Sequence, residues 1–333
     1  MRRRQFLVFA GAAALASPAG AQSSGHTRRI AIFHLSGRND VVSESGSASW
    51  RAFFAELRKW GFVEGRNLVI DRYAAESGHH IPKGLSDLLA GEPEAIVAES
   101  STWVRGINAI RPDIPLVALV ADPLGEDVAS SLAKPGRNIT GVATDTGASL
   151  LGKQLELLLE LAPGRRRVAC IGSTWPHTAM RTLWRDAQTR GVSVQEYLVH
   201  SQFRHGDARA HYVNAFPAML RDGVDAGLVL ADPEHLLHAD AIAALSLEHR
   251  LPVISPFRSL TEAGGLASYG ANRTDLEHRR AEYVARILNG AKAEHLPLQQ
   301  PTKFEFLINL KTANALGLTI PPALLIRADE VIE

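Results

Sequence analysis

The chain contains 333 residues, which is enough for two domains of ordinary size. Hydrophobic residues make up 46% of it and charged residues 21%, a composition that excludes an intrinsically disordered or fibrous protein. With 36 basic and 35 acidic side chains the formal net charge is +1, so no strong basic field indicates a nucleic-acid partner. The single cysteine, Cys170, excludes an internal disulfide and a CxxC metal site.

Residues 1–21 have the features of a secretory signal peptide. Three arginines, Arg2 to Arg4, precede an apolar run over 6–16, and small residues occupy 19–21. The apolar run is shorter than the roughly 20 residues that a membrane-spanning helix needs. We therefore expect an exported, periplasmic protein that is cleaved after Ala21. Its arginine pair resembles a twin-arginine signal, with the general secretory route as the alternative. Loss of three arginines leaves 33 basic against 35 acidic residues, a net charge of −2.

From residue 29 onward, short apolar runs rich in β-branched residues alternate with stretches of helical period. This alternation is typical of βα units that build a parallel sheet. Two sets of strands are predicted, with a junction near Gly141–Gly147. The first set covers residues 30–35, 68–73, 95–98, 116–120 and 138–143, and the second covers 168–171, 192–199, 227–230, 252–255 and 266–269. The sequence thus predicts an α/β protein with two parallel sheets.

A short sequence echo links the two sets. LVALVADP ends at Pro123 and GLVLADP ends at Pro233, so that Asp122 and Asp232 each follow a buried-type strand. One interpretation is that each aspartate caps a following helix, in which proline takes an early position. The other is that both loops line a ligand cleft, because ligands of open α/β sheets bind at the carboxyl ends of strands. The two interpretations are compatible.

Motifs for nucleotide, redox and metal chemistry are incomplete. Residues 147–153 have the spacing of a phosphate-binding loop, but Gln154 stands where a serine or threonine should bind magnesium. GxGxxG after a strand and the GxSxG elbow are both missing. His235 and His238 share a helical face, yet a zinc site needs three or four converging ligands. We therefore predict no catalytic residues, no cofactor and no metal.

Polar and aromatic side chains gather at the predicted strand ends. Hydroxyl residues ahead of a helix leave its N–H groups and dipole available to an anion, while aromatic rings supply an apolar wall. For the aromatic residues core packing is the alternative, and for Arg38 and Arg258 it is an exposed salt bridge. The predicted ligand-binding residues are Ser36, Arg38, Ser100, Ser101, Thr102 and Asp122 in the first half, with Ser173, Thr174, Trp175, Asp232, Ser255, Phe257 and Tyr269 in the second.

Several longer motifs occur together in this chain. They are GFVEGRN at 61–67, KPGRNITGV at 134–142, EAGGL at 262–266, SYG at 268–270, PTKFE at 301–305, NLKTA at 309–313 and IRADEVI at 326–332. In this order they resemble the ABC-transporter substrate-binding protein family related to tryptophan- and tyrosine-binding periplasmic proteins. The resemblance covers nearly all of the chain after the signal segment.

This resemblance implies a type I periplasmic-binding fold. Two doubly wound parallel-sheet lobes would be joined by a three-segment hinge and close over a small molecule. Lobe 1 would comprise 28–143 with about 272–305, and lobe 2 would comprise 144–271 with about 306–333. The chain would return to lobe 1 through a helix over 274–289 and recross near 304–309. Ala121 replaces a glycine of the family block, and charges at 38–40 argue against a purely aromatic amino acid ligand.

We therefore expect the solute-binding component of an ABC-type uptake system. It would capture a small polar or zwitterionic molecule, such as an amino acid or an aromatic or carboxylate compound, and would deliver it to a membrane permease with its ATPase. It would act as a monomer. We expect no nucleic-acid partner, because an export signal stands where a repressor would carry its DNA-reading helices. The alternatives are an exported two-lobed enzyme, either a hydrolase or a racemase, and a ligand sensor for a membrane receptor.

Overall fold

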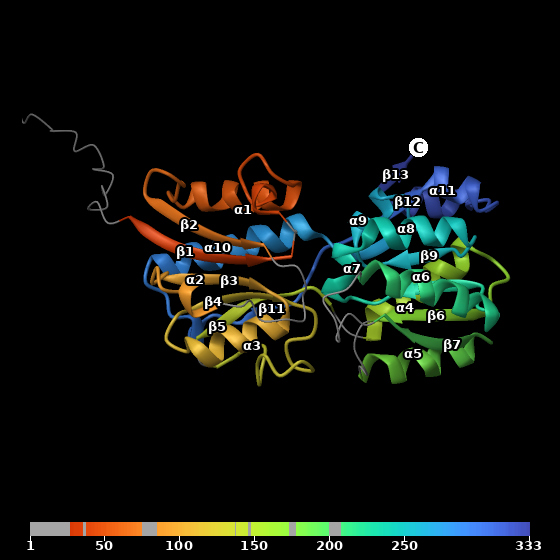
Figure 1. Ribbon diagram of the computed structural model, residues 1–333, viewed down its shortest axis with the longest axis horizontal. Coiled ribbons are helices and arrows are strands. Elements are labelled where there is room, and N and C mark those ends of the chain that lie inside the picture. Colours follow the sequence, from red (N-terminus) through yellow and green to blue (C-terminus); the bar gives the residue numbers. More distant parts are fainter. Residues whose placement is uncertain are drawn as a thin grey trace, which may run out of the picture.

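The computed structural model describes residues 27–35, 38–74, 85–136, 138–145, 148–172, 178–199 and 208–333. The predicted signal peptide lies outside these residues. Two β-sheets, each covered by helices, form two lobes that lie side by side in Figure 1. Within the described residues, no helix is both long enough and apolar enough to cross a membrane.

The first sheet has six strands, all paired in parallel. Alternate residues of β1 face opposite layers: Ile30 and Ile32 pack under α1 and α10, whereas Ala31 and Phe33 pack under α2 and α3. In spatial order the strands are β11 (Leu298–Gln299), β5 (Ile139–Ala143), β4 (Leu116–Val120), β3 (Ala95–Glu99), β1 (Arg28–His34) and β2 (Leu68–Ala74). The helices are η1 (Asn39–Val41), α1 (Ala48–Lys59), α2 (Leu85–Leu88), α3 (Ser101–Ile110), α10 (Arg273–Leu288) and η2 (Ala293–His295).

The second sheet has seven strands, and all of its pairs are parallel except β10 with β12. In spatial order they are β13 (Glu330–Ile332), β12 (Phe304–Asn309), β10 (Ala267–Ala271), β9 (Val253–Ser255), β8 (Ala226–Val229), β6 (Arg167–Gly172) and β7 (Ser193–Leu198). One face packs on α4 (Ala148–Leu161), α5 (Thr178–Thr189), α11 (Leu310–Ala315) and α12 (Pro322–Arg327). The other packs on α6 (Ala208–Arg221), α8 (Ala239–Glu248) and α9 (Arg258–Glu262), and α7 (Pro233–Leu237) precedes α8.

The two parallel-dominated α/β sheets confirm the predicted fold class, and each of the ten predicted strands is present. Three further strands, β11, β12 and β13, were not predicted as strands. Both sheets are parallel except at β12, which runs antiparallel to β10. The phosphate-loop spacing at 147–153 falls largely within α4, which begins at Ala148. A helix start therefore explains that motif.

The chain passes between the two sheets three times. It leaves the first sheet after β5, returns between β10 and α10, and leaves again between β11 and β12. The second and third passages lie side by side, because Ala271 of β10 pairs with Phe304 of β12 and the Asn272 N–H donates to the Lys303 carbonyl at 3.0 Å. In Figure 1, α10 accordingly begins on the side of the first lobe that faces the second.

Gly141 in β5 holds a position that admits no side chain. Its φ is +142°, and a Cβ would lie 2.1 Å from the carbonyl oxygen of Ala118 in the neighbouring strand. We expect Gly141→Ala to lower the free energy of unfolding by about 3 kcal/mol, because backbone strain and overpacking add. Gly136→Ala is the matched control: its φ is +80°, and a Cβ there meets nothing within 4 Å. It should cost about 1 kcal/mol in urea unfolding. If both variants lose the same unfolding free energy, the close approach of β4 to Gly141 does not contribute to the cost of the substitution.

His34 ends β1 in a fully buried position, and its Nε2 lies 3.0 Å from Oδ1 of Asn39. Burial lowers the pKa of His34, and the positive charges of Arg72 and Arg280 lower it further. The hydrogen bond with Asn39 and the charge of Glu99 act in the opposite direction but do not outweigh burial. The folded protein therefore binds the proton less readily than the unfolded chain. Stability from this group is present above the unfolded pKa of about 6.5 and is lost as the pH falls toward the folded value.

We expect His34→Gln to lose less unfolding free energy than the unsubstituted protein when the pH is lowered from 7.5 to 5.5. Urea unfolding at a series of pH values measures this difference. His295→Gln is the control, since the His295 side chain is 72% exposed, and it should keep the original pH slope. If His34→Gln shows the same pH dependence of unfolding free energy as the unsubstituted protein, buried His34 does not cause the loss of stability at low pH.

Candidate ligand-binding site

The carboxyl ends of the strands in the two sheets face each other. In the first sheet β5 ends at the first passage toward the second lobe, and every other strand runs parallel to it. In the second sheet β10 ends at the passage back, and β9, β8, β6 and β7 run parallel to β10. Ligands of open α/β sheets bind beyond the carboxyl ends of strands. The interlobe region is therefore the candidate site.

Ser100 forms the sharp junction between β3 and α3. Its φ is +72°, a left-handed conformation that costs a non-glycine residue about 1 to 3 kcal/mol. The side chain is buried and makes no capping hydrogen bond with α3. Ser101 and Thr102 open α3 and are partly buried. The structure thus places three predicted residues together at one helix N-terminus.

Asp122 and Arg38 are both exposed at this edge of the first lobe. The Asp122 Oδ1 accepts hydrogen bonds from the N–H groups of Leu124 (3.2 Å) and Gly125 (3.0 Å). Asp122 therefore organises a turn. The interpretation that it caps a following helix is wrong, because no helix follows β4 directly. Arg38 forms an ion pair with Asp40, in line with the salt-bridge interpretation, and its side chain is 75% exposed.

In the second lobe the predicted residues have local structural roles. Asp232 caps α7, accepting from the Glu234 N–H at 3.0 Å, which confirms its helix-capping interpretation. The hydroxyl of Ser255 accepts from the N–H of Phe257 at 3.0 Å. Phe257 is half-buried at the N-cap of α9. Ser36, Ser173, Thr174 and Trp175 lie outside the described residues.

Tyr269 belongs to an aromatic cluster at the passages between the lobes. Its ring stacks on Phe304 with centroids 5.8 Å apart and planes at 14°, and it meets Phe306 edge-on. The Gln154 side chain donates to the Tyr269 carbonyl at 2.8 Å. Because Tyr269 joins β10 to β12 through this stack, it stabilises the second and third passages.

A buried charged network that was not predicted from the sequence lies at the carboxyl edge of the first sheet. Glu99, the last residue of β3, accepts from the Leu35 N–H at 2.9 Å and from Arg273, and the Arg280 Nη1 lies 3.5 Å from it. Glu277 accepts from Arg273 at 3.0 Å and from Arg280 at 2.9 Å. These pairs matter because an unpaired charge in the interior destabilises a protein strongly.

The charges of this network are set by burial and pairing. For Glu99 the cost of burial is outweighed by Arg273 and Arg280, which together lower the pKa of the carboxyl group. For Glu277 burial dominates and raises the pKa. The Arg280 guanidinium also lies 5.6 Å from the ring centroid of Trp50, a cation–π contact. A glutamate ending a buried strand, and charges at i, i+4 and i+7 on the buried face of a helix, were the sequence signals for this network.

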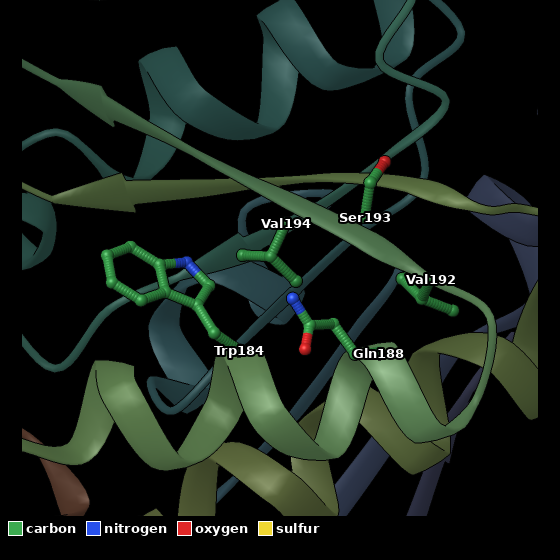
Figure 2. Close-up of a pocket in the computed structure, with 5 residues that line it drawn as sticks. All are labelled: Trp184, Gln188, Val192, Ser193 and Val194. Atoms are coloured by element: carbon green, nitrogen blue, oxygen red, sulfur yellow. The ribbon is translucent and has the colours of Figure 1, made fainter.

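A separate pocket lies at the outer edge of the second sheet. Figure 2 shows Trp184 and Gln188 of α5 beside Val194 of β7. Val192 and Ser193 complete its lining at the start of β7, at the opposite end of the strand from the interlobe region. This pocket is therefore not part of the candidate site. The described residues also contain no group of three or more His, Cys, Asp or Glu placed to hold a metal ion.

Comparisons with known proteins find chains of similar sequence and similar fold. A curated tyrosine-binding protein of Clostridioides difficile (strain R20291) is 22% identical over 273 residues, which cover 80% of this chain and 76% of that protein. A Streptococcus pneumonia ABC domain solved in complex with L-Trp has a TM-score of 0.79 at 22% identity, covering 92% of this chain and 100% of that one. A glucose-galactose binding protein from Geobacillus stearothermophilus has a TM-score of 0.58 at 15% identity, covering 85% and 98%.

These structural likenesses establish the type I periplasmic-binding fold. The model of the family described as ABC transporter substrate binding protein matches residues 42–332. Its members bind substrates and are not enzymes, so the alternative of an exported hydrolase or racemase was wrong. The chain belongs to the ABC transporter substrate binding protein family.

Proposed function

We propose that this protein is the periplasmic solute-binding component of an ABC-type uptake system. It captures a small polar or zwitterionic ligand, an amino acid or an aromatic or carboxylate compound, and delivers it to a membrane permease with its ATPase. The observation that carries the proposal is the opposition of two carboxyl strand edges across the chain passages, in a chain matched to this family over 42–332. The names of two relatives, one tyrosine-binding and one solved with L-Trp, support an amino acid ligand.

Binding would work by closure of two lobes. In this proposal lobe 1 comprises 28–143 with about 272–305, and lobe 2 comprises 144–271 with about 306–333. Contacts from both lobes exist together only when the lobes are closed, so the ligand shifts the population toward the closed form. The antiparallel β10–β12 pair supports a hinge at these passages, because it joins two of the three passages.

The ligand contacts in the proposal come from both edges. Ser100, Ser101 and Thr102 present the N-terminus of α3 from the first lobe, with Asp122 and Arg38 beside β4 and β1. Asp232, Ser255 and Phe257 follow or end strands β8 and β9 of the second lobe, and Tyr269 lies within β10. Ser36, Ser173, Thr174 and Trp175 complete the proposed set from strand-end positions in the sequence.

Location follows from the N-terminal segment. The arginine-rich start, the apolar run and the small residues before Gln22 support export to the periplasm with cleavage after Ala21. The mature protein would act there as a monomer, and neither nucleic acid nor a cofactor enters its function.

A thermal-shift screen of the mature chain from Gln22 tests the proposal. The panel contains amino acids, aromatic acids, small carboxylates, sugars and purines. A ligand at 100 times its Kd adds about 2.7 kcal/mol of stability, which raises the Tm by roughly 4 °C in a chain of this size. Unfolding and refolding beforehand removes a co-purified ligand, and mass spectrometry identifies it. A refolded protein that responds to no compound, and that released none, would overturn the proposal.

The two Asp-Pro loops provide a test at residue level. We expect Asp232→Ala to lower the free energy of unfolding by about 1 kcal/mol, because it removes the cap of α7, and to weaken binding of the screened ligand at least tenfold. Asp122→Ala should weaken binding similarly. Isothermal titration and urea unfolding measure the two effects separately.

Asn309→Ala is the matched control for these loops. Asn309 caps α11, accepting from the Thr312 N–H at 3.1 Å, and lies at the end of antiparallel β12, away from the interlobe edge. It should lose stability and keep its affinity. If Asp122→Ala and Asp232→Ala behave like this control, the two aspartates are structural and do not contact the ligand.

A further inference from the structure

Arg273 differs from every other member of the buried network in its position. It is the first residue of α10, directly after Asn272 in the second passage between the lobes. Its side chain is 31% exposed, whereas those of Glu99, Glu277 and Arg280 are 4%, 0% and 0% exposed. The network is therefore most exposed at Arg273, which lies beside the second passage between the lobes.

Two nitrogens of the Arg273 guanidinium are already held by carboxylates. Nε donates to Oε1 of Glu277 at 3.0 Å, and Nη2 donates to Oε1 of Glu99. The remaining nitrogen, Nη1, has no hydrogen-bond partner among the described residues. A guanidinium fixed on two sides with one donor edge open is preorganised to bind a carboxylate.

Other cations near the passages are engaged differently. The nitrogens of Arg258 face three carboxylates, those of Glu262, Glu330 and Glu305, the last at 3.6 Å. Lys303 lies 2.7 Å from a carboxylate oxygen of Asp275. Neither cation has the combination that Arg273 has, a rigidly held group with an open donor edge.

The N-terminus of α3 adjoins the same position. Glu99 links the two features, because its carboxylate binds Arg273 and its backbone continues through Ser100 into α3. The left-handed conformation of Ser100 turns the chain so that α3 begins beside the network. The positive end of this helix dipole therefore adds to the field of Arg273.

We propose that Arg273 binds the carboxylate of the ligand, held in place by Glu99 and Glu277, so that the site selects compounds with a free carboxylate. The inference rests on the proposed function and names the ligand chemistry of that same site. Glu277 holds the Arg273 Nε at 3.0 Å and the Arg280 Nη1 at 2.9 Å, so it fixes both guanidinium groups from one side. Glu99 does not repel the ligand, because its charge is compensated by Arg273, Arg280 and the Leu35 N–H.

The test compares each acid with its own amide. The probes are L-tyrosine, L-tryptophan and benzoate, each paired with its primary amide, titrated calorimetrically into the mature protein. A charge-assisted hydrogen bond is worth about 1.5 to 3 kcal/mol, so we expect the acid to bind roughly 10- to 150-fold more tightly than the amide. Arg273→Gln should weaken acid binding at least tenfold and change amide binding less than threefold.

Two further variants keep the test decisive. Arg273→Gln leaves Glu99 with fewer partners, so the double variant Glu99→Gln/Arg273→Gln removes both charges and protects folding; it should also lose the preference for the acid. Arg286→Gln is the matched control on the same helix, since Arg286 is 40% exposed beside Glu282 and lies about three and a half turns along α10 from Arg273. It should keep the preference, and melting curves confirm that each variant is folded.

Each result has a distinct meaning. Suppose that acids bind, and that Arg273→Gln either weakens acid and amide binding equally or weakens neither. Arg273 is then not the carboxylate anchor, although the substrate-binding function stands. If the screen finds sugars or purines and none of these acids binds, the carboxylate selection is overturned alone. If no compound of any class binds, the proposed function fails and this inference fails with it.

Discussion

The antiparallel pairing of β10 with β12 sets the geometry of the whole molecule. A parallel partner for β10 at this position would require a crossover, whereas the antiparallel one lets the chain leave β11 and enter the second sheet directly. Asn272 and Lys303 consequently lie side by side. Because β5 and β10 both end at passages, the parallel strands beside them must end on the same sides. The opposed carboxyl edges follow from these strand directions, and the β10–β12 pair holds the second and third passages together between them.

The buried charges of the first lobe connect the fold to the site. Arg280 is enclosed between Trp50 and two glutamates, an arrangement that contributes little net stability because both signs are desolvated. Its effect is geometric: Arg280 holds the carboxylates of Glu99 and Glu277 in place, and these carboxylates then fix the position of Arg273. A purely apolar cluster would pack α10 equally well on the sheet but would leave that side chain free to rotate.

The sequence predicted the sheet-forming strands well, because strands such as 95–98 and 116–120 are continuous apolar runs between helical stretches. It did not predict β12 as a strand, since Glu305 interrupts its apolar pattern and its partner lies more than 30 residues away. The site was less predictable. Polarity after a strand placed Ser100 and Asp232 at the edge of the candidate site, where their contact with a ligand stays a prediction. Arg273 and Glu99, by contrast, are paired over 174 positions. Local patterns carry no information on such distant pairs.

The adjacency of Asn272 and Lys303 also has a kinetic meaning. In the proposed closure the lobes rotate about an axis near these residues, and an atom moves in proportion to its distance from that axis. Arg273 lies next to the axis and would hardly move, whereas the far rims of the lobes would sweep through the largest arc. A ligand could therefore dock on an immobile part of the open protein first, and the approaching lobe would then complete its enclosure.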